Sequence, residues 1–118
     1  KALADGKLVI FDIDVQGFYL AKEKFADIIT SAFVLPPSLA ILEHRLIHRS
    51  TDDKEIIDAR IKNAKDEIQE LGSYDFVIVN DDIDKATQKF IHIANAAREK
   101  MSKKSREIFV SKWLTETN

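Results

Sequence analysis

The chain has no cysteine and few residues that break regular backbone structure. Its 118 residues include no cysteine, three glycines and two prolines. Without cysteine there can be no disulfide, no thiolate chemistry and no cysteine–zinc site. The same absence suits the cytoplasm, which is the location we expect. The two prolines are adjacent and no linker-like stretch is visible, so division into independent domains is not expected.

The chain also lacks a strong excess of positive or negative charge, and it lacks long apolar runs. The 18 basic and 20 acidic residues leave a net charge of −2, which creates no overall field to attract nucleic acid or an anionic membrane. No apolar run approaches the roughly 18 to 20 residues that span a bilayer. Residues 1–6 do not resemble a signal peptide, and a hydrophobic run follows them almost at once. We therefore expect no nucleic acid or membrane partner, and we expect a segment to be missing upstream.

Three short apolar runs predict buried strands at residues 8–11, 32–35 and 76–79. None of them alternates with polar residues, which is typical of a parallel sheet covered by helices on both faces. Helical patterns lie between and after these runs. The alternation predicts an α/β fold with a parallel sheet and right-handed crossovers.

Start and stop signals place the helices. The first is expected over residues 16–24, the second begins at Ser38, and the third follows a capping box formed by Asp52 and Glu55 and ends near Gly72. A fourth begins near Asp82 and the last covers residues 105–114. The inward stripe expected for the fourth helix is Ile83, Ala86, Phe90, Ile93, Ala97 and Met101.

Two acids follow the first predicted strand. Asp12 and Asp14 are two residues apart, so a strand would place both carboxylates on one side at its end. Such a pair can hold Mg²⁺ through water or accept hydrogen bonds from a base or sugar. Alternatively, Asp14 caps the next helix while Asp12 pairs with a nearby basic residue. The residues alone leave both interpretations open.

The third predicted strand is followed by Asn80, Asp81 and Asp82. Acids just before a helix usually cap it, and we favour that role for the two aspartates. The amide of Asn80 can both donate to and accept from a purine edge, which makes it a candidate ligand-binding residue.

Three arginines form the basic candidate site. Arg45 and Arg49 are four residues apart and share one helix face, and Arg60 follows on the next helix. Guanidinium groups so placed could bind a polyphosphate. A solvated surface, with Arg49 paired to Asp52 or Asp53, is the alternative that the residues by themselves favour.

The histidines do not predict a metal site. His44 and His48 have the helical spacing of zinc ligands, but no further ligand stands at a matching position, and His92 is distant in sequence. We interpret them as surface residues.

Several motifs together resemble the guanylate kinase family. Residues 8–17 read Leu-Val-Ile-Phe-Asp-Ile-Asp-Val-Gln-Gly, similar to its signature of an apolar strand followed by Asp-Ile-Asp-x-Gln-Gly. The same order continues with Val-Leu-Pro-Pro-Ser at 34–38, the three arginines, Val-Ile-Val-Asn-Asp-Asp at 77–82 and Arg-Glu-Lys-Met-Ser at 98–102. The resemblance covers nearly the whole chain and points to the bacterial type.

The resemblance implies transfer of phosphate from ATP to GMP with Mg²⁺ on a P-loop kinase fold. Asp14 would contact the guanine of GMP, and Asp12 would act near the phosphates and Mg²⁺ as a Walker-B-like acid. The lid arginines Arg45, Arg49 and Arg60 would clamp the phosphates of ATP, and Asn80 would lie by the adenine. Residues 1–37 would carry core strands and the Asp-Ile-Asp motif, 38–72 the lid, and 73–118 the last core strand and the carboxyl-terminal helices.

The chain departs from the family pattern in two places. His48 and Ser50 replace the glycines that flank the second lid arginine, which reduces the flexibility available for lid closure. No Gly-x-x-x-x-Gly-Lys-Ser/Thr loop occurs, nor does the upstream region that carries most GMP-binding residues. We therefore expect the 118 residues alone to be inactive and weakly stable.

Two other functions fit the same pattern less well. A non-catalytic guanylate-kinase-like interaction module would not need the acids and arginines that are present here. A small P-loop kinase with another acceptor would not account for Gln16 and Gly17 after Asp14. The sequence leaves the oligomeric state open, a homodimer included.

Overall fold

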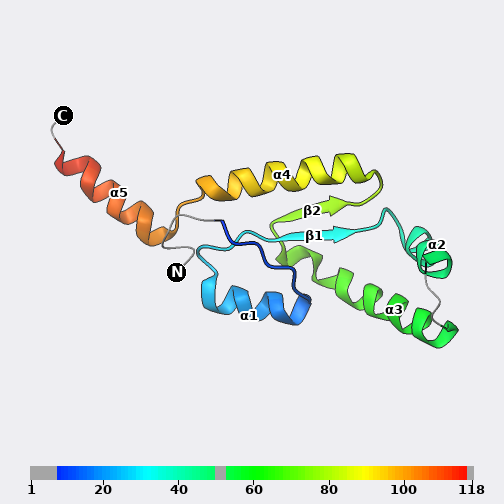
Figure 1. Cartoon of the computed structure of the whole chain (residues 1–118). Coiled ribbons are helices and arrows are strands. Elements are labelled where there is room, and N and C mark those ends of the chain that lie inside the picture. Colours follow the sequence, from blue (N-terminus) through cyan, green and yellow to red (C-terminus); the bar gives the residue numbers. More distant parts are fainter. Residues whose placement is uncertain (1–7, 50–52, 117–118) are drawn as a thin grey trace. The chain divides into compact units, whose positions relative to one another are not determined.

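The computed structural model describes residues 8–49 and 53–116. This part of the chain is rich in helix and contains a small parallel sheet, as shown in Figure 1. Its elements in chain order are α1 (Val15–Phe25), β1 (Ala32–Leu35), α2 (Leu39–Arg49), α3 (Lys54–Glu67), the 3₁₀ helix η1 (Ile68–Ser73), β2 (Phe76–Val79), α4 (Ile83–Glu99) and α5 (Lys103–Thr115).

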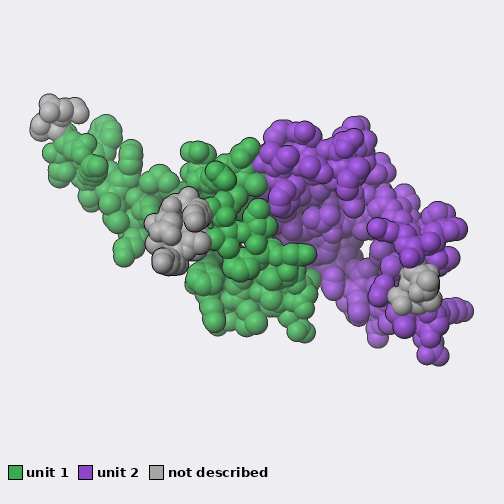
Figure 2. All heavy atoms as spheres, viewed as in Figure 1, with its two compact units in different colours: residues 1–30, 94–118 green, residues 31–93 purple. Residues whose placement is uncertain are grey.

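The chain divides into two compact units, coloured separately in Figure 2. One consists of residues 1–30 and 94–118, and it contains α1 and α5. The other consists of residues 31–93 and contains the sheet with α2, α3 and η1. The helix α4 begins in the second unit and ends in the first.

The two strands pair in parallel, which confirms that part of the predicted fold class. Ala32 lies opposite Phe76 and Leu35 opposite Val79, and both arrows point the same way in Figure 1. Both strands have the bounds predicted from the apolar runs. Only Ile78 is fully buried, at 1% exposure, whereas the other residues of β2 are exposed. In β1, Val34 is 56% exposed and no residue is fully buried. The prediction of strands buried along their whole length is therefore wrong for both strands.

The strand predicted at residues 8–11 is not formed. These residues have no regular secondary structure, and the side chain of Phe11 is 71% exposed. In the described part of the chain the sheet consists of β1 and β2, and residues 8–11 pair with neither strand. An apolar run without such a partner cannot satisfy its backbone groups as a strand.

Most of the predicted helices are present, and their first turns are capped by side chains. The hydroxyl of Ser38 accepts a hydrogen bond from the Ile41 amide at 3.2 Å in the first turn of α2. The cap of α3 is Asp53, whose carboxylate accepts from the Ile56 amide at 3.1 Å. Asp52, which was expected to be that cap, lies outside the described residues. The third helix ends as predicted near Gly72, but its last turns are the 3₁₀ helix η1.

The inward stripe predicted for α4 is only partly correct. Ala86 is buried, but Ile83 is 69% exposed, Phe90 is also exposed, and Met101 lies beyond the end of the helix. Within the described part of the chain, the buried apolar residues are Phe18, Ile78 and Ala86. A core this small cannot cover the whole apolar face of a helix of 17 residues.

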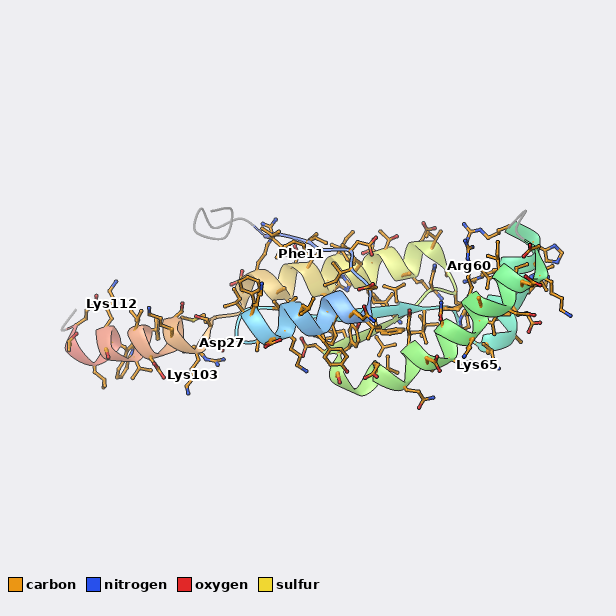
Figure 3. All side chains as sticks on the ribbon, turned by 90° about the horizontal axis from the view of Figure 1, so that it is seen from below. Phe11, Asp27, Arg60, Lys65, Lys103 and Lys112 are labelled. Atoms are coloured by element: carbon orange, nitrogen blue, oxygen red, sulfur yellow. The ribbon has the colours of Figure 1, made fainter. Side chains whose placement is uncertain are left out.

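In the unit formed by residues 1–30 and 94–118, the first turn of α5 is bonded to the segment after α1. The Lys103 amide donates to Asp27 Oδ2 at 2.5 Å, and Lys100 Nζ donates to the Ile29 carbonyl at 2.6 Å. Figure 3 labels Asp27 and Lys103.

Among the described residues, no helix combines the length and the apolar character needed to cross a membrane.

We expect Ile78→Ala to lower the free energy of unfolding by about 3 kcal/mol, because it removes buried methyl groups and leaves a cavity. Ile108→Ala is the matched control, since Ile108 in α5 is 59% exposed, and its effect should stay below about 0.5 kcal/mol. Urea denaturation followed by circular dichroism measures both. Equal effects of the two substitutions would contradict the assignment of Ile78 to the core.

Candidate anion-binding pocket

The carboxyl ends of β1 and β2 are joined just beyond the strands. The amide of Asn80, the residue after β2, donates to the carbonyl of Leu35, the last residue of β1, at 2.7 Å. This bond continues the parallel pairing by one residue. The peptide group of Asn80 is therefore held at the same sheet edge from which the chain leaves β1.

Arg45 binds that peptide group directly. Its Nη1 atom donates to the backbone carbonyl of Asn80 at 2.8 Å, and the bond is partly buried. A guanidinium has five N–H donors and this bond uses one, so other N–H groups can bind a ligand. The sequence singled out the side-chain amide of Asn80, but the structure shows that its carbonyl positions Arg45. No sequence signal could identify this contact, because every residue carries a carbonyl.

A pocket of about 510 Å³ opens at this place in the unit of residues 31–93. Its size is within the range of small-molecule sites. One part of its lining is apolar and comes from β1, the following proline and α2; the rest is polar. The lining residues are Val34, Leu35, Pro36, Leu42, Leu46, Arg45, Arg49, Arg60 and Asn80.

Three of the polar lining residues are arginines. α2 contributes Arg45 and Arg49, which are one helical turn apart, and α3 contributes Arg60, labelled in Figure 3. Among the described residues, none of those lining the pocket is an Asp or Glu. Three guanidinium groups in one pocket can bind an anion with several oxygens, because each can donate two hydrogen bonds to it. The geometry thus suits a polyphosphate next to an apolar surface.

Four of the six predicted site residues therefore lie around one pocket. Asp53, one of the two acids considered as a partner for Arg49, instead caps α3. The other, Asp52, is outside the described residues. The roles assigned to the arginines and to Asn80 remain predictions.

The other two predicted residues belong to the unit of residues 1–30 and 94–118. Asp14 is the N-cap of α1, where its Oδ1 atom accepts from the Gly17 amide at 2.7 Å. A Cβ atom at Gly17 would lie 3.1 Å from that oxygen and 3.2 Å from Ile13 Cβ, so the glycine permits this close cap. Asp12 is exposed in the segment before the helix. One expected role of Asp14, that of a helix cap, is thus confirmed.

Asp82 also has the expected capping role. Its carboxylate accepts from the amides of Asp84 at 2.9 Å and Lys85 at 3.2 Å, in the first turn of α4.

His44 and His48, the two histidines with the spacing of zinc ligands, lie side by side on α2, with their ring centroids 4.2 Å apart. In residues 8–49 and 53–116, no group of three or more potential metal ligands is found.

Known proteins match this chain over nearly its whole length. The family model described as guanylate kinase matches residues 1–97. The guanylate kinase of Sulfurimonas denitrificans is 49% identical over 113 residues, which cover 96% of this chain and 55% of that protein. That of Wolinella succinogenes is 43% identical over 113 residues, with 53% of that protein covered. That of Mesorhizobium japonicum is 47% identical over 97 residues, which are 82% of this chain and 44% of that protein. The chain thus spans about half the length of the curated relatives it matches.

We expect Asp14→Ala to lower the stability of α1 by about 1 kcal/mol, because it removes the acceptor for the Gly17 amide. Asp14→Asn keeps a side-chain acceptor and should cost only a few tenths of a kcal/mol. Asp12→Ala is the neighbouring control and should have no effect on helix content. Thermal melting followed by circular dichroism compares the three variants, and equal losses in Asp14→Ala and Asp12→Ala would contradict the capping role.

Proposed function

Because the chain belongs to the guanylate kinase family, we propose that it supplies the phosphate clamp of a kinase that moves the γ-phosphoryl group of ATP to GMP. The observation that carries this proposal is the convergence of Arg45, Arg49 and Arg60 on one pocket beside Asn80. The proposed architecture is the P-loop kinase fold with helices on both faces of its sheet. The division into residues 1–37, 38–72 and 73–118, a cytoplasmic location and a homodimer remain predictions.

The proposed ligand of the pocket is a nucleoside triphosphate, whose orientation follows from the lining. The phosphates would bind the arginines, and the adenine would lie against the apolar part of the lining near Asn80. The carbonyl of Asn80 holds Arg45 in place, so the Arg45 side chain loses less conformational entropy on binding phosphate than an unrestrained arginine would. Arg49 and Arg60 come from two successive helices that contact each other, so their distance depends on how α2 packs on α3.

Asp14 is proposed to bind the guanine of GMP while it caps α1. The Gly17 amide bonds to one carboxylate oxygen, Oδ1. The second oxygen, with its lone pairs, can accept from the N–H groups of a guanine edge. Capping and base binding are therefore compatible in one side chain.

The residues present are compatible with Mg²⁺ of the kind that accompanies ATP. Mg²⁺ usually keeps several waters and binds one or two carboxylates together with substrate phosphates, rather than a cage of protein ligands. Asp12 offers one exposed carboxylate of this type. When bound with ATP, Mg²⁺ would neutralise charge on the β- and γ-phosphate oxygens.

The chemistry proposed for these residues is positioning and charge stabilisation. A phosphate oxygen of GMP forms a bond to the γ-phosphorus of ATP as the bond from that phosphorus to the bridging oxygen of ADP breaks. Negative charge spreads over the γ-phosphoryl oxygens during this step, and the arginines stabilise it there. No covalent intermediate on the protein is needed. A non-catalytic interaction module would have no use for three arginines around one pocket.

We expect Arg49→Ala and Arg60→Ala each to weaken ATP binding about tenfold or more, because each removes charge-assisted hydrogen bonds to phosphate. Arg106→Ala is the matched control, since Arg106 is an exposed residue of α5 outside the pocket. Isothermal titration calorimetry with ATP measures all three. Equal affinities for the three variants would contradict the phosphate clamp.

In the enzyme that contains these residues, we expect Asp14→Asn to raise the KM for GMP about tenfold, because the guanine loses a charged acceptor. The thermal stability should change little, since asparagine keeps the helix cap. A coupled assay of ADP formation with ATP, Mg²⁺ and GMP measures the KM. ADP formation that does not depend on GMP would contradict the proposed acceptor.

A further inference from the structure

Ser31 and Asp75 form a reciprocal pair of hydrogen bonds at the amino ends of the two strands. The Ser31 amide donates to Asp75 Oδ2 at 2.9 Å, and the Ser31 hydroxyl is 3.3 Å from the same oxygen. In return, the Asp75 amide donates to Ser31 Oγ at 2.9 Å. The two residues are 44 positions apart in the sequence.

This pair stands directly before the first matched residues of the sheet. Ser31 precedes β1 and Asp75 precedes β2, and the Phe76 amide donates to the Ser31 carbonyl at 2.9 Å. Ala32 then lies opposite Phe76 in the parallel register. The Ser31–Asp75 pair is therefore placed where it can determine which residue of β1 faces which residue of β2.

The strands themselves specify their register weakly. Their sequences are Ala-Phe-Val-Leu and Phe-Val-Ile-Val, with an apolar residue at every position. A slip of two residues would keep apolar side chains on the same faces, so burial alone discriminates poorly against it. Such a slip would displace the far ends of the strands by about 6.6 Å. Only groups with specific partners, such as those of Ser31 and Asp75, distinguish the two registers.

The opposite end of the same strands carries the arginine pocket. There the Asn80 amide bonds to the Leu35 carbonyl, and the Asn80 carbonyl holds Arg45. A change of register would remove both bonds, and with them the contact that holds Arg45 at the sheet edge. We propose that Ser31 and Asp75 are positioning residues, which align the strands so that Asn80 can hold Arg45 in the pocket; this rests on the proposed function.

The test compares alanine substitutions with conservative substitutions at both positions. Ser31→Ala removes the bonds made by the Ser31 hydroxyl, and Asp75→Ala removes those accepted by Asp75 Oδ2. Ser31→Thr keeps the hydroxyl, and Asp75→Asn keeps an acceptor oxygen. Ser111→Ala in α5 and Asp66→Ala in α3 are matched controls on exposed positions. The measurements are hydrogen exchange of individual backbone amides by NMR and the affinity for ATP by calorimetry.

We expect both alanine variants to show about tenfold faster exchange at the amides of Phe76 and Asn80 and about tenfold weaker ATP binding. Threonine at 31 and asparagine at 75 should restore both quantities to within about twofold of the unchanged chain. Faster exchange at Phe76 alone, with Asn80 and ATP affinity unchanged, would show a local role and overturn the proposal. So would conservative variants as impaired as the alanine variants.

Two further outcomes are distinguishable. If Asp75→Ala unfolds the unit, seen as faster exchange in α3 as well, Ser31→Ala decides, because it leaves the bond from the Ser31 amide to Asp75 in place. Unchanged exchange at Asn80 in Ser31→Ala would then overturn the proposal. If the enzyme that contains these residues, without any substitution, fails to bind ATP, the proposed function fails, while exchange at Asn80 still tests the alignment of the strands.

Discussion

The parallel pairing of β1 with β2 is the interaction on which the rest of the described site depends. It brings together residues about 44 positions apart and places the two carboxyl ends at one sheet edge. From that edge the Asn80 carbonyl bonds Arg45, and α2 and α3 then bring Arg49 and Arg60 to the same pocket. Parallel strands need a long connection, and here that connection is the segment carrying all three arginines.

The site combines a rigid part with parts that depend on helix packing. Arg45 is bonded to the sheet edge, whereas Arg49 lies in the last turn of α2 and Arg60 lies on α3. The bond to the Asn80 carbonyl holds Arg45 where it can receive a phosphate, and the distance between Arg49 and Arg60 follows from how α2 packs on α3. This division suits a phosphoryl transfer in which charge moves during the reaction.

Asp14 has a structural role as the cap of α1, beside the binding role proposed for it. Its bond to the Gly17 amide accounts for the glycine, because any side chain there would crowd Asp14 and Ile13. The motif Asp-x-Gln-Gly at 14–17 thus has a local physical reason that is independent of any ligand. The proposed contact with guanine uses the other carboxylate oxygen, Oδ2.

The sequence by itself determined the bounds of β1 and β2, their parallel pairing and most helices. These features follow from apolar runs, capping residues and the spacing of apolar residues, all of which involve positions close together in the chain. It did not determine the state of residues 8–11, since a strand forms only where another strand accepts its hydrogen bonds. From the residues alone, a solvated surface was the favoured interpretation of the three arginines. Only the tertiary structure brought them to one pocket, because the contact between Arg45 and the Asn80 carbonyl joins residues 35 positions apart through a backbone atom that every residue has.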